Sequence, residues 1–452
     1  TPSSTFLVAG GGESDGKSMA EPNLLRRPSR TRSAYPLLER GHMNGYSTLV
    51  ATALCILLGL PSASLAQGGY FGRNKVQYRE FDFKVLKTDH FDVYYYPEEE
   101  PAAQMASRMA ERWYTRLSQL LNHQLSTRQP LILYASGSHF RQTNAIQGDL
   151  GEGTGGVTEA YKRRIVLPFA GPIEASDHVL GHELVHAFQY DITGTNVNAG
   201  TPGALGLPLW FIEGMAEYLS VGPVDPLTAM WMREATRRES LPDIDKLDNP
   251  KYFPYRYGQA LWAFIAGKYG DGAVANMLRA AAGRDATYAS AIESVLQIST
   301  KELTREWHNA EFEAFRPIAE ATKMPASFAR PLITSEKQRG ELNIGPELSP
   351  DGSRLVFFSE KDLFSIDMFV ADARTGEVIK KITNTATNTH YESLSFLTSA
   401  GAWDQAGKRF VFPGLSKGDP VPTLVDVDKG RTEREFPLSE VAEAVNPAWS
   451  PE

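Results

Sequence analysis

His182, Glu183 and His186 are the residues whose types and spacing most clearly point to chemistry. On a helix, positions i and i+4 share a face, so both imidazoles can reach one metal ion. The glutamate between them is rotated by about 100° around the helix axis, toward the place where a water molecule on that ion would sit. We therefore expect a Zn²⁺ site that activates water.

The neighbouring residues favour a helix that is buried in a domain core. Ser176 or Asp177 can cap the beginning of this helix, and Glu174 lies near its positive end. Apolar side chains recur around the histidines at Val179, Leu180, Leu184, Val185 and Phe188. Because the chain has only nine histidines, we expect an accidental H-E-x-x-H on the order of once per hundred such sequences.

A third ligand must complete the site, and its position distinguishes the classes of zinc peptidase. A metzincin has Gly three residues and His six residues beyond the second His, where this chain has Gln189 and Ile192. The alternative is a glutamate from a later helix. A loop at 193–206, rich in Gly, Asn, Thr and Pro, is long enough to turn the chain back toward such a helix.

The segment 208–219 supplies that helix, with the sequence Pro-Leu-Trp-Phe-Ile-Glu-Gly-Met-Ala-Glu-Tyr-Leu. It resembles the W-x-x-E-G-x-A-E-Y segment of gluzincin peptidases, such as the aminopeptidase N and peptidase-MA-like families. The resemblance implies that Glu213 binds zinc. It also implies that Glu217, one turn further, supports a ligand or forms a salt bridge.

Three other polar residues near the His pair need a role. His178 lies one turn before His182 and could be a ligand, but a substrate-side or partly exposed histidine fits better, because two His, one Glu and water complete the catalytic set. Asp191 and Gln189 could each orient a metal-bound imidazole through its other ring nitrogen. The sequence is compatible with either.

Segments before and after this helix offer contacts for a substrate. The Gly-rich segment 153–167 predicts a loop entering an edge strand, where an extended peptide can pair. Within it, Gly-Val-Thr-Glu-Ala faintly resembles the amine-binding G-x-M-E-N segment of aminopeptidase N enzymes. This makes Glu159 a candidate for substrate binding, or otherwise a solvated strand residue. Downstream, Tyr257 could donate to the oxyanion of a tetrahedral intermediate, or simply pack as an aromatic residue.

The composition is that of a folded protein with two or three domains. The chain has 452 residues, of which 42% are hydrophobic and 22% charged, and its net charge of -8 gives no electrostatic reason to bind nucleic acid. Residues 1–42 lack periodicity and are rich in Ser, Arg, Pro and Gly. We expect them to be a disordered extension.

Residues 43–66 have the pattern of a signal peptide. An apolar run at 49–60 is too short to cross a bilayer comfortably, and Ser64 and Ala66 suit a signal peptidase. No Lys or Arg lies between Met43 and the run, so an uncleaved anchor beginning further upstream stays open. Cys55, the only cysteine, lies within the run, so the mature chain from about Gln67 would have no disulfide and no catalytic thiol. We expect an exported protein, periplasmic or secreted.

Residues 67–330 are expected to form an α+β zincin-like domain. Alternating apolar residues at 81–85 and 91–95 predict neighbouring antiparallel strands, followed by a helix at 100–121 and a strand at 130–134. These elements match the upper half of a gluzincin domain by resemblance. The mostly helical stretch 207–318 matches its lower half, with the cleft between the two halves.

Residues 331–452 change to short strands separated by turns. The segment 346–358 is repeated more weakly at 401–412 and begins again at 446–452. The aligned residues Leu348, Trp403 and Trp449 are 55 and 46 residues apart, near the period of a four-stranded propeller blade. The segments resemble the TolB-like repeat N-P-x-[WF]-S-P-D-G, which implies an all-β propeller that is incomplete in this chain. An ordinary β-sandwich is the alternative.

Together these features predict an exported zinc metallopeptidase in which Glu183 is the general base. The alternative is a non-catalytic envelope scaffold with a vestigial gluzincin domain and a TolB-like propeller. The intact set of ligands and base favours the enzyme. The expected partners are a peptide or protein substrate and a protein bound through the propeller. Nucleic acid is not expected as a partner. Contact with a membrane is expected only through an uncleaved signal segment.

Overall fold

The computed structural model describes residues 77–146, 150–194, 206–283, 285–338 and most of 340–450. The predicted extension at 1–42, the predicted signal peptide at 43–66 and most of the loop at 193–206 lie outside the described residues. The described part of the chain is a mixed α+β protein with three sheets, none of which closes into a barrel or a propeller. Within this part, no helix combines the length and apolar character that a bilayer crossing requires.

The first sheet has five strands in the spatial order β1-β2-β3-β5-β4. Strands β2, β3 and β5 are parallel, and β1 and β4 pair antiparallel at the two edges. The antiparallel pair β1–β2 and strand β3 confirm the predicted strands, although Phe81 and Phe83 precede β1. The strands are β1 (Lys84–Lys87), β2 (Phe91–Tyr95), β3 (Gln129–Tyr134), β4 (Val157–Glu159) and β5 (Arg164–Pro168).

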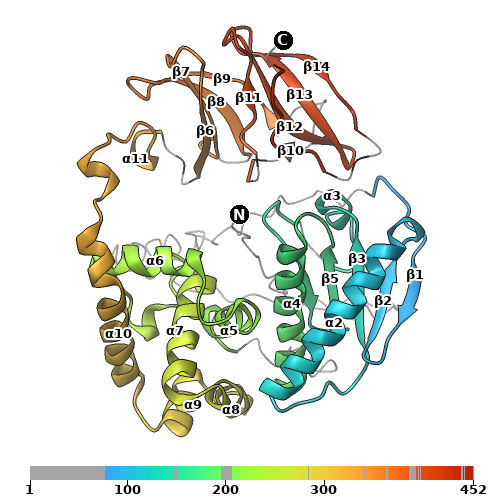
Figure 1. Ribbon diagram of the computed structural model, residues 1–452, viewed down its shortest axis with the longest axis vertical. Helices are drawn as coiled ribbons and strands as arrows, with labels where there is room; N and C mark the ends of the chain where they lie inside the picture. The colour runs from blue at the N-terminus through green and yellow to red at the C-terminus, as the bar shows by residue number, and fades with distance from the viewer. Residues whose placement is uncertain are drawn as a thin grey trace, which may run out of the picture. The chain divides into compact units, whose positions relative to one another are not determined.

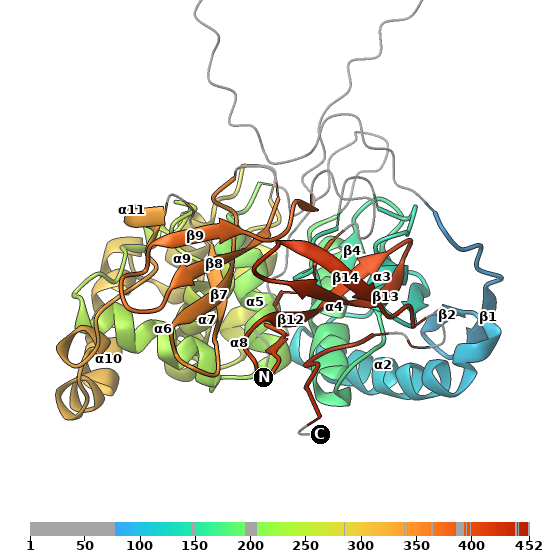
Figure 2. The same cartoon turned by 90° about the horizontal axis from the view of Figure 1, so that it is seen from above.

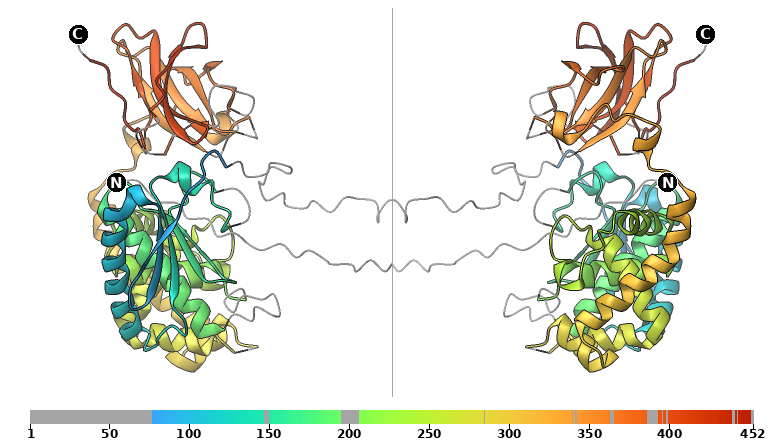
Figure 3. Two further views of the ribbon diagram at one scale, coloured as in Figure 1. Left: turned by 90° about the vertical axis from the view of Figure 1, so that its right-hand side faces the viewer. Right: turned by 90° about the vertical axis from the view of Figure 1, so that its left-hand side faces the viewer.

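Helices α2 and α4 cover one face of this sheet (Figures 1 and 3). Alternate strand residues, such as Leu131 and Ile165, join both helices in one apolar core. The intervening strand residues, such as Tyr134 and Val166, belong to a separate apolar cluster. The reason is that successive side chains of a strand point to opposite faces of the sheet. Helix α2 confirms the helix predicted from Glu100. The helices of this part are η1 (Pro97–Glu99), α2 (Glu100–Leu120), α3 (Gly137–Phe140) and α4 (Ile173–Thr193).

The next part of the chain is helical, as predicted. Helix α5 lies between α4 and α7 in both Figure 1 and Figure 2. Its elements are α5 (Leu209–Val221), α6 (Pro226–Arg237), η3 (Ile244–Lys246), α7 (Pro254–Tyr269), α8 (Gly272–Ala280), α9 (Tyr288–Leu296) and α10 (Thr300–Ala321). Two short helices, η4 (Pro325–Ser327) and α11 (Ser335–Gln338), lead to the strands that follow.

Helices α5 and α7 cross with their backbones almost in contact. A Cβ on Gly214 would lie 2.4 Å from Cα of Gly258, and a Cβ on Gly258 would lie 2.3 Å from the carbonyl oxygen of Trp210. Beside the crossing, Trp262 donates from Nε1 to the carbonyl oxygen of Phe211 at 3.0 Å. Only glycine fits at the crossing point, which therefore fixes the two helices relative to each other.

The C-terminal strands form two antiparallel sheets that share an apolar core. The first is a meander of β6 (Asn343–Leu348), β7 (Arg354–Ser359), β8 (Asp367–Asp372) and β9 (Val378–Lys381). The second contains β10 (Ser393–Leu394), β11 (Ala402–Trp403), β12 (Arg409–Ser416), β13 (Asp419–Asp426) and β14 (Arg431–Glu435).

The aligned tryptophans make the same hydrogen bond in successive repeats. Trp403 donates from Nε1 to the carbonyl oxygen of Glu347 at 3.0 Å. Trp449 donates in the same way to Ala402 at 3.0 Å. Glu347 and Ala402 each directly precede the aligned position of their repeat.

An arginine covers each of these rings. The guanidinium carbon of Arg354 lies 5.2 Å from the ring centroid of Trp403, and that of Arg409 lies 4.9 Å from the centroid of Trp449. Both arginines follow the aligned position of the preceding repeat by six residues. The sequence repeat is therefore also a packing repeat, with cation–π contacts linking one unit to the next.

We predict that Gly258→Ala lowers the free energy of unfolding by about 1–3 kcal/mol, because the added methyl group forces the helix crossing apart. The control is Gly267→Ala on the same helix, where the added Cβ has no neighbour within 4 Å. That change should raise stability by up to about 1 kcal/mol, since alanine favours a helix. Urea unfolding of both variants measures the difference, and equal stabilities would show that the crossing is not a constraint.

Candidate metal centre

Helix α4 carries the two histidines into the first core and is fixed there by Trp113 of α2. A Cβ on Gly181 would lie 2.6 Å from the Trp113 ring, and the Nε1 of Trp113 donates to Oδ1 of Asp177 at 2.9 Å. The helix begins at Ile173 with Pro172 as its N-cap. The predicted capping by Ser176 or Asp177 is therefore wrong, because the helix starts earlier and both residues lie inside it.

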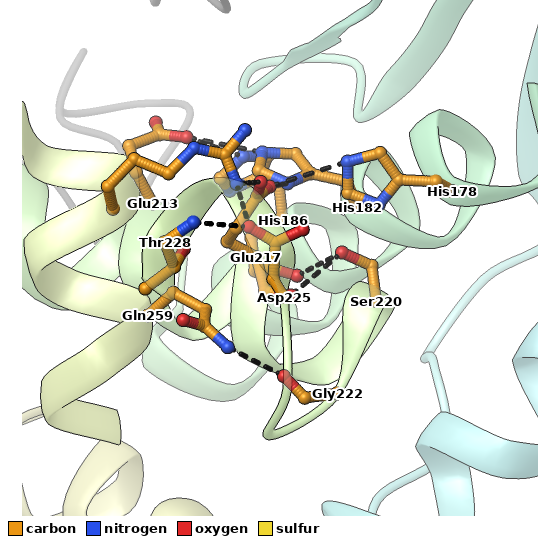
Figure 4. Close-up of polar contacts among 12 residues, drawn as sticks. His178, His182, His186, Glu213, Glu217, Ser220, Gly222, Asp225, Thr228 and Gln259 are labelled. Carbon is orange, nitrogen blue, oxygen red and sulfur yellow. Dashed lines mark hydrogen bonds and ion pairs between the residues drawn. The ribbon is translucent and has the colours of Figure 1, made fainter. Parts of the chain in front are cut away.

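Helix α5 places Glu213 and Glu217 against the two histidines. Nε2 of His182 and Nε2 of His186 each lie 3.3 Å from Oε2 of Glu213. Nδ1 of His182 lies 3.1 Å from Oε2 of Glu217. Because the later glutamate meets the earlier histidine, the two helices run antiparallel, and the four side chains converge (Figure 4).

The hydrogen bonds of the two rings define which nitrogen of each ring faces Glu213. Nε2 of Gln189 donates to the carbonyl oxygen of Ile212 at 2.9 Å, so Oε1 of Gln189 accepts from Nδ1 of His186 at 2.8 Å. The carboxylate of Glu217 likewise accepts from Nδ1 of His182. In a neutral ring the proton then sits on Nδ1, and the lone pair of Nε2 faces Glu213.

This arrangement fits a zinc ion. Two lone pairs and a carboxylate oxygen would repel one another unless a cation or a proton lay between them. Ligands held tetrahedrally at about 2.0–2.1 Å from zinc are about 3.3 Å apart, which matches the 3.3 Å between each Nε2 and Oε2 of Glu213. In addition, Oε1 of Glu213 is buried without a hydrogen-bond partner among the described residues. His182, His186 and Glu213 can therefore hold the ion.

Glu217 connects this centre to a buried arginine. Its Oε1 accepts from Nη1 of Arg256 at 2.8 Å, and the same nitrogen lies 3.1 Å from Oδ2 of Asp225. Asp225 in turn caps α6 by accepting from the backbone N–H of Thr228 at 2.6 Å (Figure 4). The network ties three helices together around the imidazole of His182.

The pKa shifts follow from these contacts among the protein groups alone. Burial would lower the pKa of His182, but the hydrogen bonds with Glu213 and Glu217 outweigh it and raise the pKa to about 10. Burial would raise the pKa of Glu213, but His186 and His182 lower it to about 2. The site thus favours positive charge at the ring nitrogens, which a bound dication would supply as well.

Glu183 is buried beside the ligands, and burial raises its pKa. Its Oε2 accepts a hydrogen bond from Oγ1 of Thr158 on strand β4 at 2.7 Å. Thr158 was not predicted from the sequence, although it lies next to Glu159, the predicted substrate residue. The charges of His186 and His182 oppose this rise in pKa, whereas that of Glu213 adds to it.

Two predicted site residues have other partners. Asp191 binds His123 at 2.7 Å and also pairs with Arg163, so Gln189 rather than Asp191 orients His186. The carboxylate of Glu159 accepts from the backbone of the β4–β5 turn and from Nε of Arg164 at 3.1 Å. Glu159 stabilises this turn, and its contact with a substrate stays a prediction.

Tyr255 contacts the centre, whereas Tyr257 was the tyrosine predicted to do so. The Tyr255 ring stacks on that of His182, with centroids 5.9 Å apart and 22° between the planes. Burial, together with Glu213 and Glu183, raises the pKa of Tyr255 well above its usual value, so its phenol keeps its proton. Tyr257 instead packs edge-to-face on Tyr252 and Trp231. Residues two apart on a helix point about 200° apart, so only one can face the metal.

Two more side chains border the centre. Nε2 of His178 lies 3.4 Å from Oε2 of Glu217, and burial lowers the pKa of His178 to about 4. His178 could form a second ligand group with His182 and Glu217, but Arg256 already binds that glutamate. Tyr190 lies one turn beyond His186, and burial, Glu213 and Glu183 raise its pKa. Its spacing from His186 was the signal that could have identified it.

Comparison of the chain with models of known protein families and with curated proteins finds no match.

We predict that Glu213→Ala weakens zinc binding more than Glu217→Gln does. The first change removes a ligand, whereas the second keeps the size of the side chain and an acceptor for Nδ1 of His182. Loss of such a supporting contact typically costs about 10–100-fold in metal affinity, and loss of Glu213 should cost more. Competition with a chelator measures the affinities, with circular dichroism as the control for folding. Equal affinities would exclude Glu213 as a ligand.

Proposed function

We propose that this protein is a zinc-dependent peptidase with a gluzincin fold. The observation that carries the proposal is the convergence of Nε2 of His182, Nε2 of His186 and Oε2 of Glu213, with Glu183 on the same helix. Bound there, zinc would lower the pKa of a water molecule and polarise a substrate carbonyl. The mixed α+β architecture and the antiparallel pair α4–α5 are consistent with this fold.

Glu183 is the general base of the proposed reaction. It takes a proton from the attacking water and passes it to the leaving amine. Because burial raises the pKa of Glu183, its carboxylate is a stronger base than that of an exposed glutamate, which suits a group that accepts a proton from water. Tyr255 takes the role first predicted for Tyr257: its protonated phenol, stacked on His182, donates to the oxyanion.

An extended peptide is the substrate that the sheet favours. Strand β4 lies at the edge of the first sheet, and its neighbour on the inner side is β5. The backbone of an edge strand can pair with an extended chain, which would lie next to Glu183 because Thr158 of β4 touches that residue. A peptide bond is therefore the reacting group that we propose.

We also propose that residues 331–452 are part of a TolB-like propeller that binds or gates the substrate. Two antiparallel sheets and the recurring contacts of Trp403 and Trp449 support a blade-like repeat. Export through residues 43–66 belongs to the proposal and is supported by their sequence pattern alone.

We predict that Glu183→Gln keeps zinc and fold but lowers peptide hydrolysis by at least about 10²-fold, because it removes the group that accepts the proton. Glu174→Gln is the matched control, since Glu174 is exposed on the same helix and should leave the rate unchanged. The measurements are zinc content and cleavage of a peptide library.

Two outcomes would contradict the peptidase. Equal hydrolysis by the wild type and Glu183→Gln would exclude the general base. If neither protein cleaved any peptide while both bound the same protein partner, the scaffold function would replace the enzyme.

A further inference from the structure

Strand β4 holds the carboxylate of Glu183 through one hydroxyl group. Oγ1 of Thr158 lies 2.7 Å from Oε2 of Glu183 and 2.7 Å from the backbone carbonyl oxygen of the same residue. Both residues are buried, at 7% and 3% exposure. The threonine therefore bridges the mobile end of the glutamate side chain and the helix backbone from which that side chain projects.

This bridge restricts the side chain of Glu183. A glutamate reaches its carboxylate through three rotatable bonds, and its backbone carbonyl is fixed within α4. A single hydroxyl placed 2.7 Å from both oxygens selects the conformations that bring Oε2 back over the helix. A threonine in a strand has few accessible χ1 rotamers, so the hydroxyl itself is already oriented.

Gly156 completes the support from the same face of the strand. A Cβ at this position would lie 2.8 Å from Cγ and 3.0 Å from Oε1 of Glu183. Residues i and i+2 of an extended segment point to the same side, so Gly156 and Thr158 both face α4. Glu159 points to the other side, which explains why it stabilises the turn and not the site.

We propose that Thr158 is the positioning residue of the general base, and that it aligns the base with the edge strand on which the peptide substrate pairs. The inference rests on the proposed function and extends it. The substrate and the base would share β4 as a common frame, so the attacking water meets the peptide carbonyl in one fixed geometry. Thr158 acts through Glu183 and does not touch the substrate's reacting atoms.

The first test measures the contact without measuring activity. Thr158→Val and Glu183→Ala are made singly and together in the full chain loaded with zinc, and thermal unfolding is followed. A hydrogen bond to a carboxylate of this kind corresponds to a shift of about 3–6 °C in the unfolding midpoint. We expect that shift from Thr158→Val in the wild-type background, and less than about half of it when Glu183 is already alanine.

The second test measures positioning, with a peptide that the wild type cleaves. Thr158→Val should lower kcat by about 10–100-fold with little change in KM, because substrate binding does not need the hydroxyl. Thr158→Ser keeps the hydroxyl and should restore most of the rate. Thr236→Val is the matched control, since Oγ1 of Thr236 on α6 is buried without a hydrogen-bond partner among the described residues and its loss should leave kcat unchanged.

The outcomes separate this inference from the proposed function. Additive unfolding shifts for Thr158→Val and Glu183→Ala overturn the inference, and so does a wild-type kcat in Thr158→Val. In either case, the proposed peptidase function still stands if the wild type cleaves a peptide and Glu183→Gln does not. A wild type that cleaves no peptide overturns the peptidase and the positioning role together. The inference is supported if the two substitutions are measurably coupled, if Thr158→Val lowers kcat, and if Thr158→Ser restores it.

Discussion

The contact between α4 and α5 around the ring of His182 is the interaction on which the rest of the site depends. Both ring nitrogens of this residue face a carboxylate, Glu213 on one side and Glu217 on the other. One ring thus determines the register of two antiparallel helices. A sliding of either helix by one residue would move a glutamate about 100° away from its histidine. The tight crossing with α7 at Gly214 and Gly258 holds α5 in place, and the contact of Gly181 with the Trp113 ring holds α4.

The burial of so many ionisable groups is costly, and it restricts what the site can be. Glu183, Glu213 and Glu217 are almost fully buried, and Arg256 is the one buried guanidinium that the described residues place against them. Removing an ion from water costs several kcal/mol unless partners compensate for it. A purely structural core would not need three carboxylates at one point, whereas a site for a divalent cation requires an excess of negative charge. The charge distribution is therefore compatible with a divalent cation at this point.

The sequence predicted the features that depend on the spacing of residues along one helix. It was less successful where the rotation of a helix about its axis, or the face of a strand, decides which side chain points toward the site. His182, Glu183 and His186 follow from the i, i+4 rule, and Glu213 was identified by resemblance. Whether Asp191 or Gln189 meets His186, and whether Tyr255 or Tyr257 meets the centre, depends in each case on how a helix is rotated about its axis. The contact of Thr158 with Glu183 was not predicted, because the two faces of a short strand differ by a single residue. No local pattern in the sequence reports these rotations.

The two histidines have different partners, and this asymmetry affects the proposed chemistry. A carboxylate that accepts a hydrogen bond from Nδ1 makes the imidazole a stronger electron-pair donor to a metal. An amide oxygen in the same place has a smaller effect. His182 has Glu217 and His186 has Gln189. Each added negative charge near a zinc ion reduces its ability to acidify water, so a second carboxylate partner would weaken the proposed reaction. Arg256 offsets the charge of Glu217, with its Nη1 2.8 Å from Oε1 of that residue. The arrangement thus keeps His182 oriented by a strong hydrogen bond, and Glu213 would be the one carboxylate to act directly on a bound ion.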